Sequence, residues 1–459
     1  MNLNIKNGDS MELLKTIPSN SVDCMVTDPP YGISFMSKDW DKAVPDVAIW
    51  KECLRVMKPG AFAFVMCSPR SDVQAEMVIK LKEAGFDVGF TPIYWVYASG
   101  FPKAMNISKA VDRKLGYERE ITGIGQNFGR ADSGIYQMNV NGENKHVFQR
   151  KDEPISEEAQ RLDGSYAGYQ PKPAVEVIIV AMKPLSEKTY VDQALKNGKG
   201  ITWLDDGRIP YQSEKDKNSA VWGNDFNVRN TEYEGGWESR GKNLLASNEG
   251  RFPANLLVQD NALDIGVNKI SRVLDISKLP PVGKNGIYGN YKEQTCLRGY
   301  EDSGDLSRYF SLDAWYSKNI EELPDYIQRI FPFLYVPKAS SGERNEDLEN
   351  LTDGIHGHGN LGNSKGLERF NSIAKNIHPT VKPLKLMTYI ITIGSRPGDT
   401  ILDPFLGSGT TGVAAAILNR NFIGFEINES YFEIAENRIK ARQTQSVIEA
   451  YFNDNGGSE

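Results

Sequence analysis

VDCMVTDPPY (residues 22–31) has the pattern of a buried β-strand that ends in a rigid polar turn. Apolar and β-branched side chains dominate Val22 to Thr27, and a carboxylate, two prolines and an aromatic residue follow them. Each proline fixes its own φ, removes a backbone donor and biases the residue before it toward an extended conformation. The turn therefore offers acceptors and no competing N–H. Because open α/β sheets bind ligands at the carboxyl ends of their strands, we expect residues 28–31 to line a ligand site.

This turn suits chemistry on an amino group attached to a heteroaromatic ring. Such a nitrogen is a poor nucleophile because its lone pair is delocalised into the ring. Two acceptors, the Asp28 carboxylate and the Pro29 carbonyl, could hold its hydrogens and favour a tetrahedral, attacking geometry. Tyr31 could stack on the base, a contact worth roughly 1–3 kcal/mol per base. The alternative is a strand followed by a Pro-Pro turn with a surface tyrosine.

A second stretch near the other end of the chain indicates a nucleoside-binding turn. TILDPFLGSGTTG (residues 400–412) has the pattern of a strand, a glycine-rich turn and the start of a helix over 413–418. Glycines let the backbone approach a ligand closely, and a helix amino end favours polar or anionic groups. A strand predicted over 421–427 carries Glu426, 19 residues after Gly407. That spacing matches the acidic residue that takes ribose hydroxyls in nucleoside-binding α/β folds.

Together, these two stretches resemble the S-adenosylmethionine-dependent DNA amino-methyltransferases. The catalytic motif precedes the cofactor motif, which is the order of the permuted β group of that family. Further matches are Asn7-Gly8-Asp9-Ser10, Leu54-Arg55-Val56-Met57-Lys58-Pro59-Gly60 and His378-Pro379-Thr380-Val381-Lys382-Pro383. The resemblance covers roughly residues 1 to 115 and 330 to 440.

The resemblance implies roles for individual residues. Asp28, Pro29, Pro30 and Tyr31 would form the catalytic turn. The residues expected to contact S-adenosylmethionine are Asp9, Ser10, Asp28, Thr380, Lys382, Pro383, Asp403, Phe405, Gly407, Ser408, Gly409, Thr410, Glu426 and Asn428. Asp9 would lie near the adenine of the cofactor, although Asp9 or Ser10 could instead cap the helix that follows.

The implied substrate is an adenine in double-stranded DNA, flipped out of the stack so that its N6 amino group can be reached. In the permuted group an Asp at position 28 goes mainly with adenine and a Ser mainly with cytosine. Phe35 and Trp40 would contact the substrate from the loop after Tyr31, or they could be core residues. Besides DNA, the resemblance leaves two questions open: whether a cognate restriction endonuclease is a partner, and whether the protein is a monomer or a homodimer.

The composition is that of an ordinary globular protein. The chain has 459 residues, 40% of them hydrophobic and 25% charged, and its net charge of −7 argues against a blanket electrostatic grip on nucleic acid. The four cysteines lack metal-ligand spacing, so we expect reduced, structural thiols and no metal. The absence of a basic segment followed by an apolar one, and of an apolar run of about 18 residues, predicts a cytoplasmic protein. The family resemblance implies a prokaryotic or phage origin.

Strands that alternate with helices predict a mostly parallel α/β sheet. The resemblance implies a Rossmann-like class I methyltransferase fold, circularly permuted, with a seven-stranded sheet built from both chain ends. Strands are expected over 3–6, 61–67, 86–97, 175–182, 201–204, 255–258 and 331–336, and helices over 11–17, 47–57, 72–84, 107–115, 190–195, 384–393 and 431–442. We expect residues 1–115 to be the catalytic half, 116–170 a flexible insertion, 171–184 a strand that returns to the sheet, 185–330 an inserted target-recognition region, 331–442 the cofactor half and 443–459 a tail.

Other functions fit the residues less well. The nearest is N4-cytosine methylation, since cytosine presents the same kind of amine. A methyltransferase for RNA or protein is disfavoured by the long insert and the motif order. A DNA-binding relative without catalysis is disfavoured by the intact Asp28, Tyr31, Gly407 and Glu426. A nicotinamide dehydrogenase matches only two glycines of its fingerprint.

Overall fold

The structure is a computed structural model of the whole chain. It describes residues 2–32, 43–97, 104–119, 121–125, 137–140, 143–146, 149–169, 174–211, 213–219, 250–258, 269–270, 303–304, 310–321, 354–357, 371–374, 378 and 380–455. The chain forms two compact units. The larger unit comprises residues 1–96 and 175–459, and the smaller one comprises residues 97–174.

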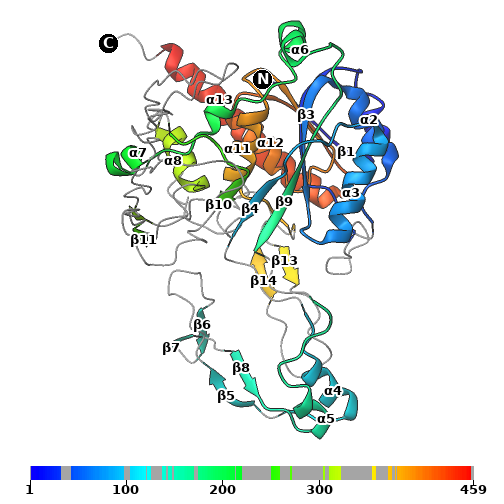
Figure 1. The fold of residues 1–459 in the computed structure, drawn as a ribbon, viewed down its shortest axis with the longest axis vertical. Helices are drawn as coiled ribbons and strands as arrows, with labels where there is room; N and C mark the ends of the chain where they lie inside the picture. Colours follow the sequence, from blue (N-terminus) through cyan, green and yellow to red (C-terminus); the bar gives the residue numbers. More distant parts are fainter. Residues whose placement is uncertain are drawn as a thin grey trace, which may run out of the picture. The chain divides into compact units, whose positions relative to one another are not determined.

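An eight-stranded sheet forms the centre of the larger unit (Figure 1). Its strands are β1 (Leu3–Asn7), β2 (Val22–Thr27), β3 (Met57–Cys67), β4 (Ile93–Val96), β9 (Val175–Met182), β10 (Leu256–Val258), β15 (Thr400–Asp403) and β16 (Asn421–Glu426). The spatial order is β1-β16-β15-β2-β3-β9-β4-β10. Every neighbouring pair is parallel except the two that involve β9, which is antiparallel to both β3 and β4.

The two ends of the chain meet inside this sheet. Strand β15 pairs with β2, with Ile401 opposite Cys24 and Leu402 opposite Met25. Strand β16 pairs with β1, so that Asn7 lies opposite Glu426. In Figure 1 the blue and the orange segments therefore lie side by side. This confirms that both ends of the chain build one sheet.

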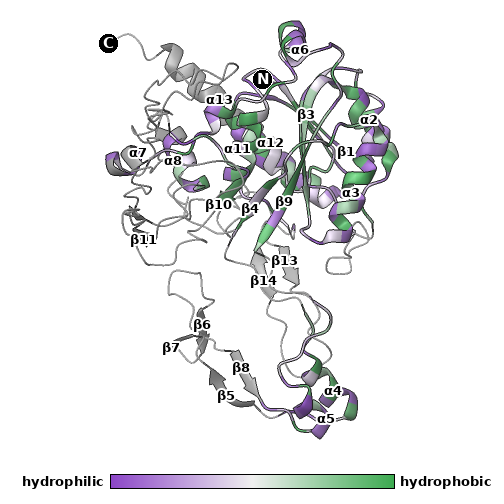
Figure 2. Ribbon diagram, viewed as in Figure 1, coloured by the Kyte–Doolittle hydropathy of each residue, from purple (hydrophilic) through white to green (hydrophobic). Residues whose placement is uncertain are grey.

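Helices cover both faces of the sheet. They are α1 (Ser10–Leu14), α2 (Val47–Val56), α3 (Ser71–Ala84), α6 (Tyr190–Asn197), α7 (Glu214–Ser219), α8 (Leu312–Glu321), α11 (Leu384–Gly394), α12 (Thr410–Ile417) and α13 (Glu429–Asn455), with a 3₁₀ turn η3 at Leu204–Gly207. Apolar residues of α2 and α3, such as Trp50 and Met77, share one buried cluster with Met25, Ala63 and Val65 of the sheet. Helices α11, α12 and α13 pack one against the next, with α11 against β2, α12 against β15 and β16, and α13 against β1 and β16. In Figure 2 β3 and α12 are mainly hydrophobic, whereas α2 and α3 carry both kinds of residue.

Local signals set several helix ends as expected. Asp46 accepts a hydrogen bond from the Ala48 N–H at 2.8 Å and caps α2. Gly85 ends α3 in the left-handed conformation, with φ of 105°. Asn106 caps helix α4 (Ile107–Leu115) of the smaller unit, whose bounds match the predicted ones. These ends follow from residues next to one another in the chain, which is why a single sequence could locate them.

Four expectations about the fold were wrong. The sheet has eight strands instead of seven, because β10 adds to its edge beside β4. The strand expected over 86–97 is limited to β4, and only an isolated bridge at Asp87 pairs its first part. Residues 201–204 form no strand, since Trp203 instead donates its N–H to the Ile393 carbonyl of α11. Helix α13 continues through most of the expected tail, to Asn455.

The smaller unit has more regular structure than the predicted flexible insertion. It contains α4, α5 (Glu157–Arg161) and two short antiparallel pairs, β5 (Ile121–Gly125) with β8 (Gln149–Asp152) and β6 (Gln137–Val140) with β7 (Glu143–His146). Buried Asp112 connects the two helices, because it accepts hydrogen bonds from the Ser156 backbone and hydroxyl and from Arg119 Nε at 2.6 Å. Burial acts to raise the pKa of Asp112, but these donors hold it well below its usual range.

Some predictions lie outside the described residues. Phe35 and Trp40 are among them, as is the strand expected over 331–336. Between 259 and 378 the structure also describes the short pairs β11 (Lys269–Ile270) with β12 (Ser303–Gly304) and β13 (Gly354–Gly357) with β14 (Asn371–Ala374). None of the described helices has both the length and the apolar character needed to span a bilayer.

Candidate active site

The two motifs lie side by side at the carboxyl edge of the sheet. Strands β2 and β15 are parallel neighbours, so the turns that follow them begin next to each other. Thr27, the last residue of β2, donates its hydroxyl to Asp403 Oδ1, at the end of β15, over 2.7 Å. Both side chains are buried. The hydrogen bond fixes the turn of Asp28 relative to the glycine-rich turn.

Asp28 is held by two partners. Its Oδ2 lies 2.5 Å from Lys382 Nζ, and its Oδ1 accepts a hydrogen bond from the Tyr31 hydroxyl at 2.6 Å. Lys382 Nζ also lies 5.5 Å from the centre of the Tyr31 ring, within cation–π range. Pro29 is buried and Pro30 is half-buried. The structure therefore brings Asp28, Tyr31 and Lys382 together as one cluster, although their expected roles were assigned to two different ligands.

Glu176 is a fourth member of this cluster, and the sequence reading missed it. Its Oε2 lies 3.3 Å from Lys382 Nζ, and its side chain is 17% exposed. Because β9 runs antiparallel to its neighbours, its first residues lie at the edge where β3 and β4 end. A sequence signal existed, since Glu176 is the one charged residue in the apolar strand Val175–Met182.

Burial sets the protonation behaviour of the cluster. Desolvation raises the pKa of Asp28, and the charge of Glu176 raises it further, while Lys382 partly offsets both effects. Desolvation alone would lower the pKa of Lys382, but the two carboxylates outweigh it and the pKa is raised. Lys382 therefore carries a positive charge, and both Asp28 and Glu176 interact with it.

The glycine-rich turn can accept no side chain at two of its positions. Gly407 and Gly409 have φ of 54° and 83°, which favour glycine. A Cβ on Gly407 would lie 3.0 Å from His378 Nε2, and one on Gly409 would lie 2.9 Å from Ala435. Buried Arg438 of α13 braces the turn, because its guanidinium donates to the Ser408 carbonyl at 2.7 Å. The sequence-based prediction missed Arg438, which carries no signal beyond its place in a predicted helix.

Glu426, the last residue of β16, is hydrogen-bonded to the glycine-rich turn. Its Oε2 accepts the Gly407 N–H at 2.9 Å and its Oε1 accepts the Asn428 N–H at 2.8 Å. Burial nevertheless raises the pKa of Glu426 to about 7. Asn428 caps α13, since its Oδ1 accepts the Tyr431 N–H at 3.1 Å. A carboxylate has about four acceptor sites, so Glu426 retains capacity for further donors such as hydroxyl groups.

Asp403 lies beneath the same turn. It accepts hydrogen bonds from Thr27, from the Thr411 hydroxyl at 2.6 Å and from the Phe405 N–H at 3.1 Å. Despite these donors, burial raises its pKa to about 6. Thr410 Oγ1 lies 3.2 Å from the Arg438 guanidinium. Asp403 and Thr410 thus shape the turn from inside.

The predicted residues of the first strand have structural partners. Asp9 caps α1 by accepting the Met11 N–H at 2.8 Å, which confirms the capping alternative. Ser10 is buried and donates its hydroxyl to the Pro404 carbonyl at 2.5 Å. Both follow β1, beside the end of β16, where the Gly8 N–H donates to the Glu426 carbonyl. Capping uses one carboxylate oxygen of Asp9 and leaves its other acceptor sites for a ligand.

The segment before α11 borders the turn from the other side. The Thr380 N–H donates to His378 Nδ1 at 3.3 Å, and His378 packs edge-on against Tyr431. Pro383 immediately precedes α11 and is buried. Phe405, half-buried, packs edge-on against Trp50 of α2 with ring centres 5.9 Å apart. All the described candidate residues thus lie along one edge of the sheet.

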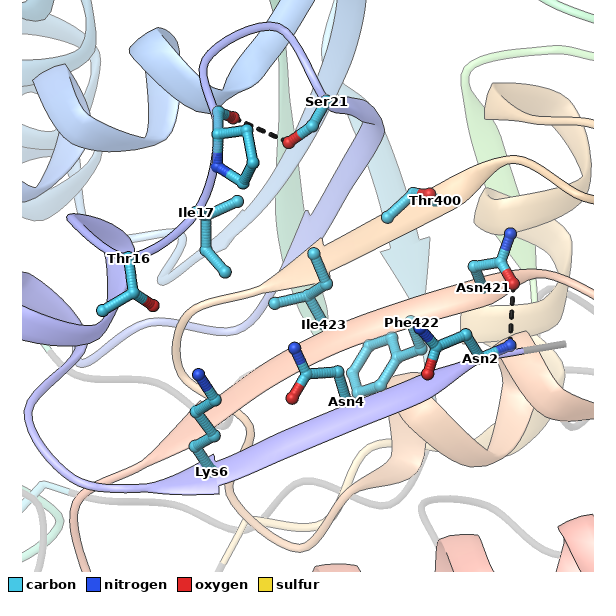
Figure 3. A pocket seen from close by; sticks show the side chains of 11 residues that line it. Asn2, Asn4, Lys6, Thr16, Ile17, Ser21, Thr400, Asn421, Phe422 and Ile423 are labelled. Carbon is cyan, nitrogen blue, oxygen red and sulfur yellow. Dashed lines mark hydrogen bonds between the residues drawn. The ribbon is translucent and has the colours of Figure 1, made fainter.

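A separate cavity of about 400 Å³ lies away from this edge (Figure 3). Asn2, Asn4 and Lys6 of the β1 segment line it, together with the first residues of β15 and β16 and the turn before β2. Lys6 is the one charged residue among those that line it. No group of three or more His, Cys, Asp or Glu side chains placed to hold a metal occurs among the described residues.

Comparison with known proteins identifies the family of this chain. Residues 22–437 match the N6/N4 DNA methylase family, which is most of the chain. The chain belongs to that family. It is 52% identical over 64 residues to the type II methyltransferase M2.DpnII of Streptococcus pneumoniae, covering 14% of this chain and 24% of the relative. It is 46% identical over 66 residues to M.HinfI of Haemophilus influenzae, covering 14% and 18%. The aligned stretches thus span less than a quarter of either relative.

Among solved structures, the complex of M1.HpyAVI with S-adenosylmethionine aligns over 95% of this chain and 98% of its own, with 16% identity and a TM-score of 0.36. The family is S-adenosylmethionine-dependent. The candidate residues fit that molecule. The positive φ of Gly407 and Gly409 favours glycine, which leaves this turn without side chains at two positions, and Glu426 beside the turn can accept further hydroxyl donors.

Proposed function

We propose that this DNA methyltransferase transfers a methyl group from S-adenosylmethionine to the N6 amino group of adenine at a specific site in double-stranded DNA. The observation that carries the proposal is the hydrogen bond between Thr27 and Asp403. It places a carboxylate turn suited to an aromatic amine beside a glycine turn suited to a nucleoside. Both turns follow parallel strands that come from opposite ends of the chain, as in the permuted β group.

The chain's own residues prepare the target amine. Asp28 and the Pro29 carbonyl accept the two amino hydrogens of a flipped base, which favours a tetrahedral nitrogen. Tyr31 is fixed by its hydrogen bond to Asp28 and offers its ring for stacking. Lys382 holds Asp28 in place through the other carboxylate oxygen. The amino proton lost after methylation passes to Asp28 or to water.

A second set of residues holds the methyl donor, whose sulfonium supplies an electrophilic methyl group. Glu426 accepts from the ribose hydroxyls, Asp9 lies toward the adenine, and Phe405 packs beside the glycine turn. Thr380 and Pro383 border the methionine end, where His378 closes the turn. Ser10, Asp403, Ser408, Thr410 and Asn428 support these contacts through the hydrogen bonds described above.

Adenine is favoured over cytosine because Asp28 stands where permuted enzymes for cytosine mainly have Ser. Target recognition is assigned to the insertion between the two halves, within residues 185–330. The described part of that segment lies in the same compact unit as the sheet, and Trp315 of α8 donates its indole N–H to the Asp206 carbonyl at 2.7 Å.

The test is to incubate the purified protein with S-adenosylmethionine and unmethylated DNA, digest the DNA to nucleosides and quantify modified bases by mass spectrometry. N6-methyladenine is the expected product. N4-methylcytosine would keep the site and overturn the choice of base. Absence of any modified base would refute the proposal.

Asp28→Ala should abolish transfer and leave binding of DNA largely intact, because Asp28 acts on the amine and makes no phosphate contact. Asp72→Ala is a suitable control, since Asp72 is an exposed carboxylate on α3 that pairs with Arg70. If the Asp28 variant kept near-normal activity, the assigned role would be wrong.

A further inference from the structure

Two carboxylates share one buried ammonium at the candidate active site. Lys382 Nζ lies 2.5 Å from Asp28 and 3.3 Å from Glu176, and the three side chains are between 10% and 19% exposed. A pair made of Asp28 and Lys382 alone would be electrically neutral. The cluster of three has a net charge of −1.

That extra charge matters because Asp28 must act as an acceptor. A carboxylate committed to a single ammonium is a weaker acceptor for a third group, since the cation already draws on its electron density. A second carboxylate on the same ammonium weakens the interaction of that ammonium with Asp28, so Asp28 remains a better hydrogen-bond acceptor. Glu176 is placed to do so from β9, an element separate from both turns.

We propose that Glu176 is a positioning residue of the methyltransferase, which shares Lys382 with Asp28 so that the ammonium orients the catalytic carboxylate without neutralising the site. The inference rests on the proposed function, because it assigns a role in the same reaction. It also makes the site complementary to a cationic methyl donor, since one negative charge remains uncompensated among these residues.

Other charged or titratable groups also face Asp28. The Tyr31 hydroxyl donates to it, Cys67 at the end of β3 lies within its electrostatic range, and Asp403 interacts with it from β15. Asp403 and Glu176 are the two acids among the described groups that act on Asp28, and of these two Glu176 is the one that pairs with Lys382. Glu176 therefore acts on Asp28 through a defined partner, the Lys382 ammonium, as well as through its own charge.

The decisive experiment compares single-turnover methylation by wild type, Glu176→Gln and Glu176→Asp between pH 5 and 9. In the Gln variant the rate at neutral pH should fall roughly tenfold. The acid limb of its profile should move to lower pH, because Asp28 must be ionised and the loss of a neighbouring negative charge eases its ionisation. The Asp variant should recover part of the rate. Glu187→Gln, which removes a surface partner of Lys196, is the matched control and should behave as wild type.

Two further measurements separate this role from a structural one. In calorimetry without DNA, Glu176→Gln should weaken binding of S-adenosylmethionine roughly threefold more than binding of S-adenosylhomocysteine, because only the former has a positively charged sulfur. In a Lys382→Met background, Glu176→Gln should have little additional effect on the rate.

The outcomes distinguish this inference from the proposed function. If wild type methylates no DNA base, the proposed function fails. If wild type is active and Glu176→Gln keeps its rate and pH profile, or loses affinity for both ligands equally, the positioning role is overturned.

Discussion

Replacing Asp403 with Asn should stabilise this protein at neutral pH. Asp403 is 2% exposed, and burial raises its pKa from the ordinary value of 3.8 to about 6. A tenfold change in a dissociation constant is worth about 1.4 kcal/mol, so keeping this carboxylate ionised in the folded state costs roughly 3 kcal/mol. Asparagine avoids that cost. Its oxygen can still accept from Thr27 and the Phe405 N–H, while its amide can donate to the Thr411 hydroxyl.

The sign of the pH dependence follows from the raised pKa. Wild type carries no penalty below pH 3.8, where Asp403 is protonated in both the folded and the unfolded chain. The penalty grows as the pH rises and is complete above the folded-state pKa of about 6. The excess stability of Asp403→Asn should therefore increase between pH 4 and 7 and then stay constant, at about 1–3 kcal/mol.

Scanning calorimetry of the DNA-free protein at several pH values measures this difference. A gain of a few degrees in the unfolding midpoint at pH 8 is expected, shrinking at pH 5. Asp72→Asn is the control, because that exposed carboxylate has a lowered pKa and should give no gain at high pH. A stability difference for Asp403→Asn that did not grow between pH 4 and 7 would refute the reasoning.

Two other variants test the cofactor turn. Gly409→Ala should weaken S-adenosylmethionine at least about tenfold in calorimetry, because its Cβ would lie 2.9 Å from Ala435. The control is Gly398→Ala, because Gly398 also has a positive φ but has open space around it. Equal losses of affinity in the two variants would contradict a steric cause. Glu426→Gln tests the raised pKa of about 7. Wild-type affinity for S-adenosylhomocysteine should rise between pH 6 and 8 as Glu426 ionises and accepts the ribose hydroxyls more strongly, whereas a rise of the same size in the Gln variant would exclude Glu426 as its source.

The parts of the fold that could be predicted depend on residues close together in the chain. Strand β2 and helix α4 were located to the residue because an apolar pattern and a capping or terminating residue marked each end. Strand β10 was located too, but its membership in the sheet was not. Its three residues pair with β4 about 160 positions away, and no local pattern encodes such a partner.

The candidate site was predicted as a set of motifs, but the way its members contact one another was not. The sequence indicated Asp28 and Lys382 separately, for the amine and for the methyl donor. Their ion pair depends on how the start of α11 packs against the end of β2, which is a tertiary feature. Wrong predictions had the same origin. Residues 201–204 are apolar, as a strand would be, but Trp203 uses its backbone donor on α11.

The order of strands along the sheet gives the proposed chemistry a spatial sequence. The strands β1, β16, β15 and β2 are consecutive neighbours, and their carboxyl ends carry Asp9, Glu426, Asp403 and Asp28 in that order. In the proposed function these positions correspond to adenine, ribose, the turn next to the methyl donor and the target amine. Strand β9 then brings Glu176 to the far side of Asp28. Because β9 is antiparallel to β3 and β4, its first residues, and not its last ones, lie at this edge. Variants of Glu176 therefore test whether the one antiparallel strand of the described sheet contributes to the proposed chemistry.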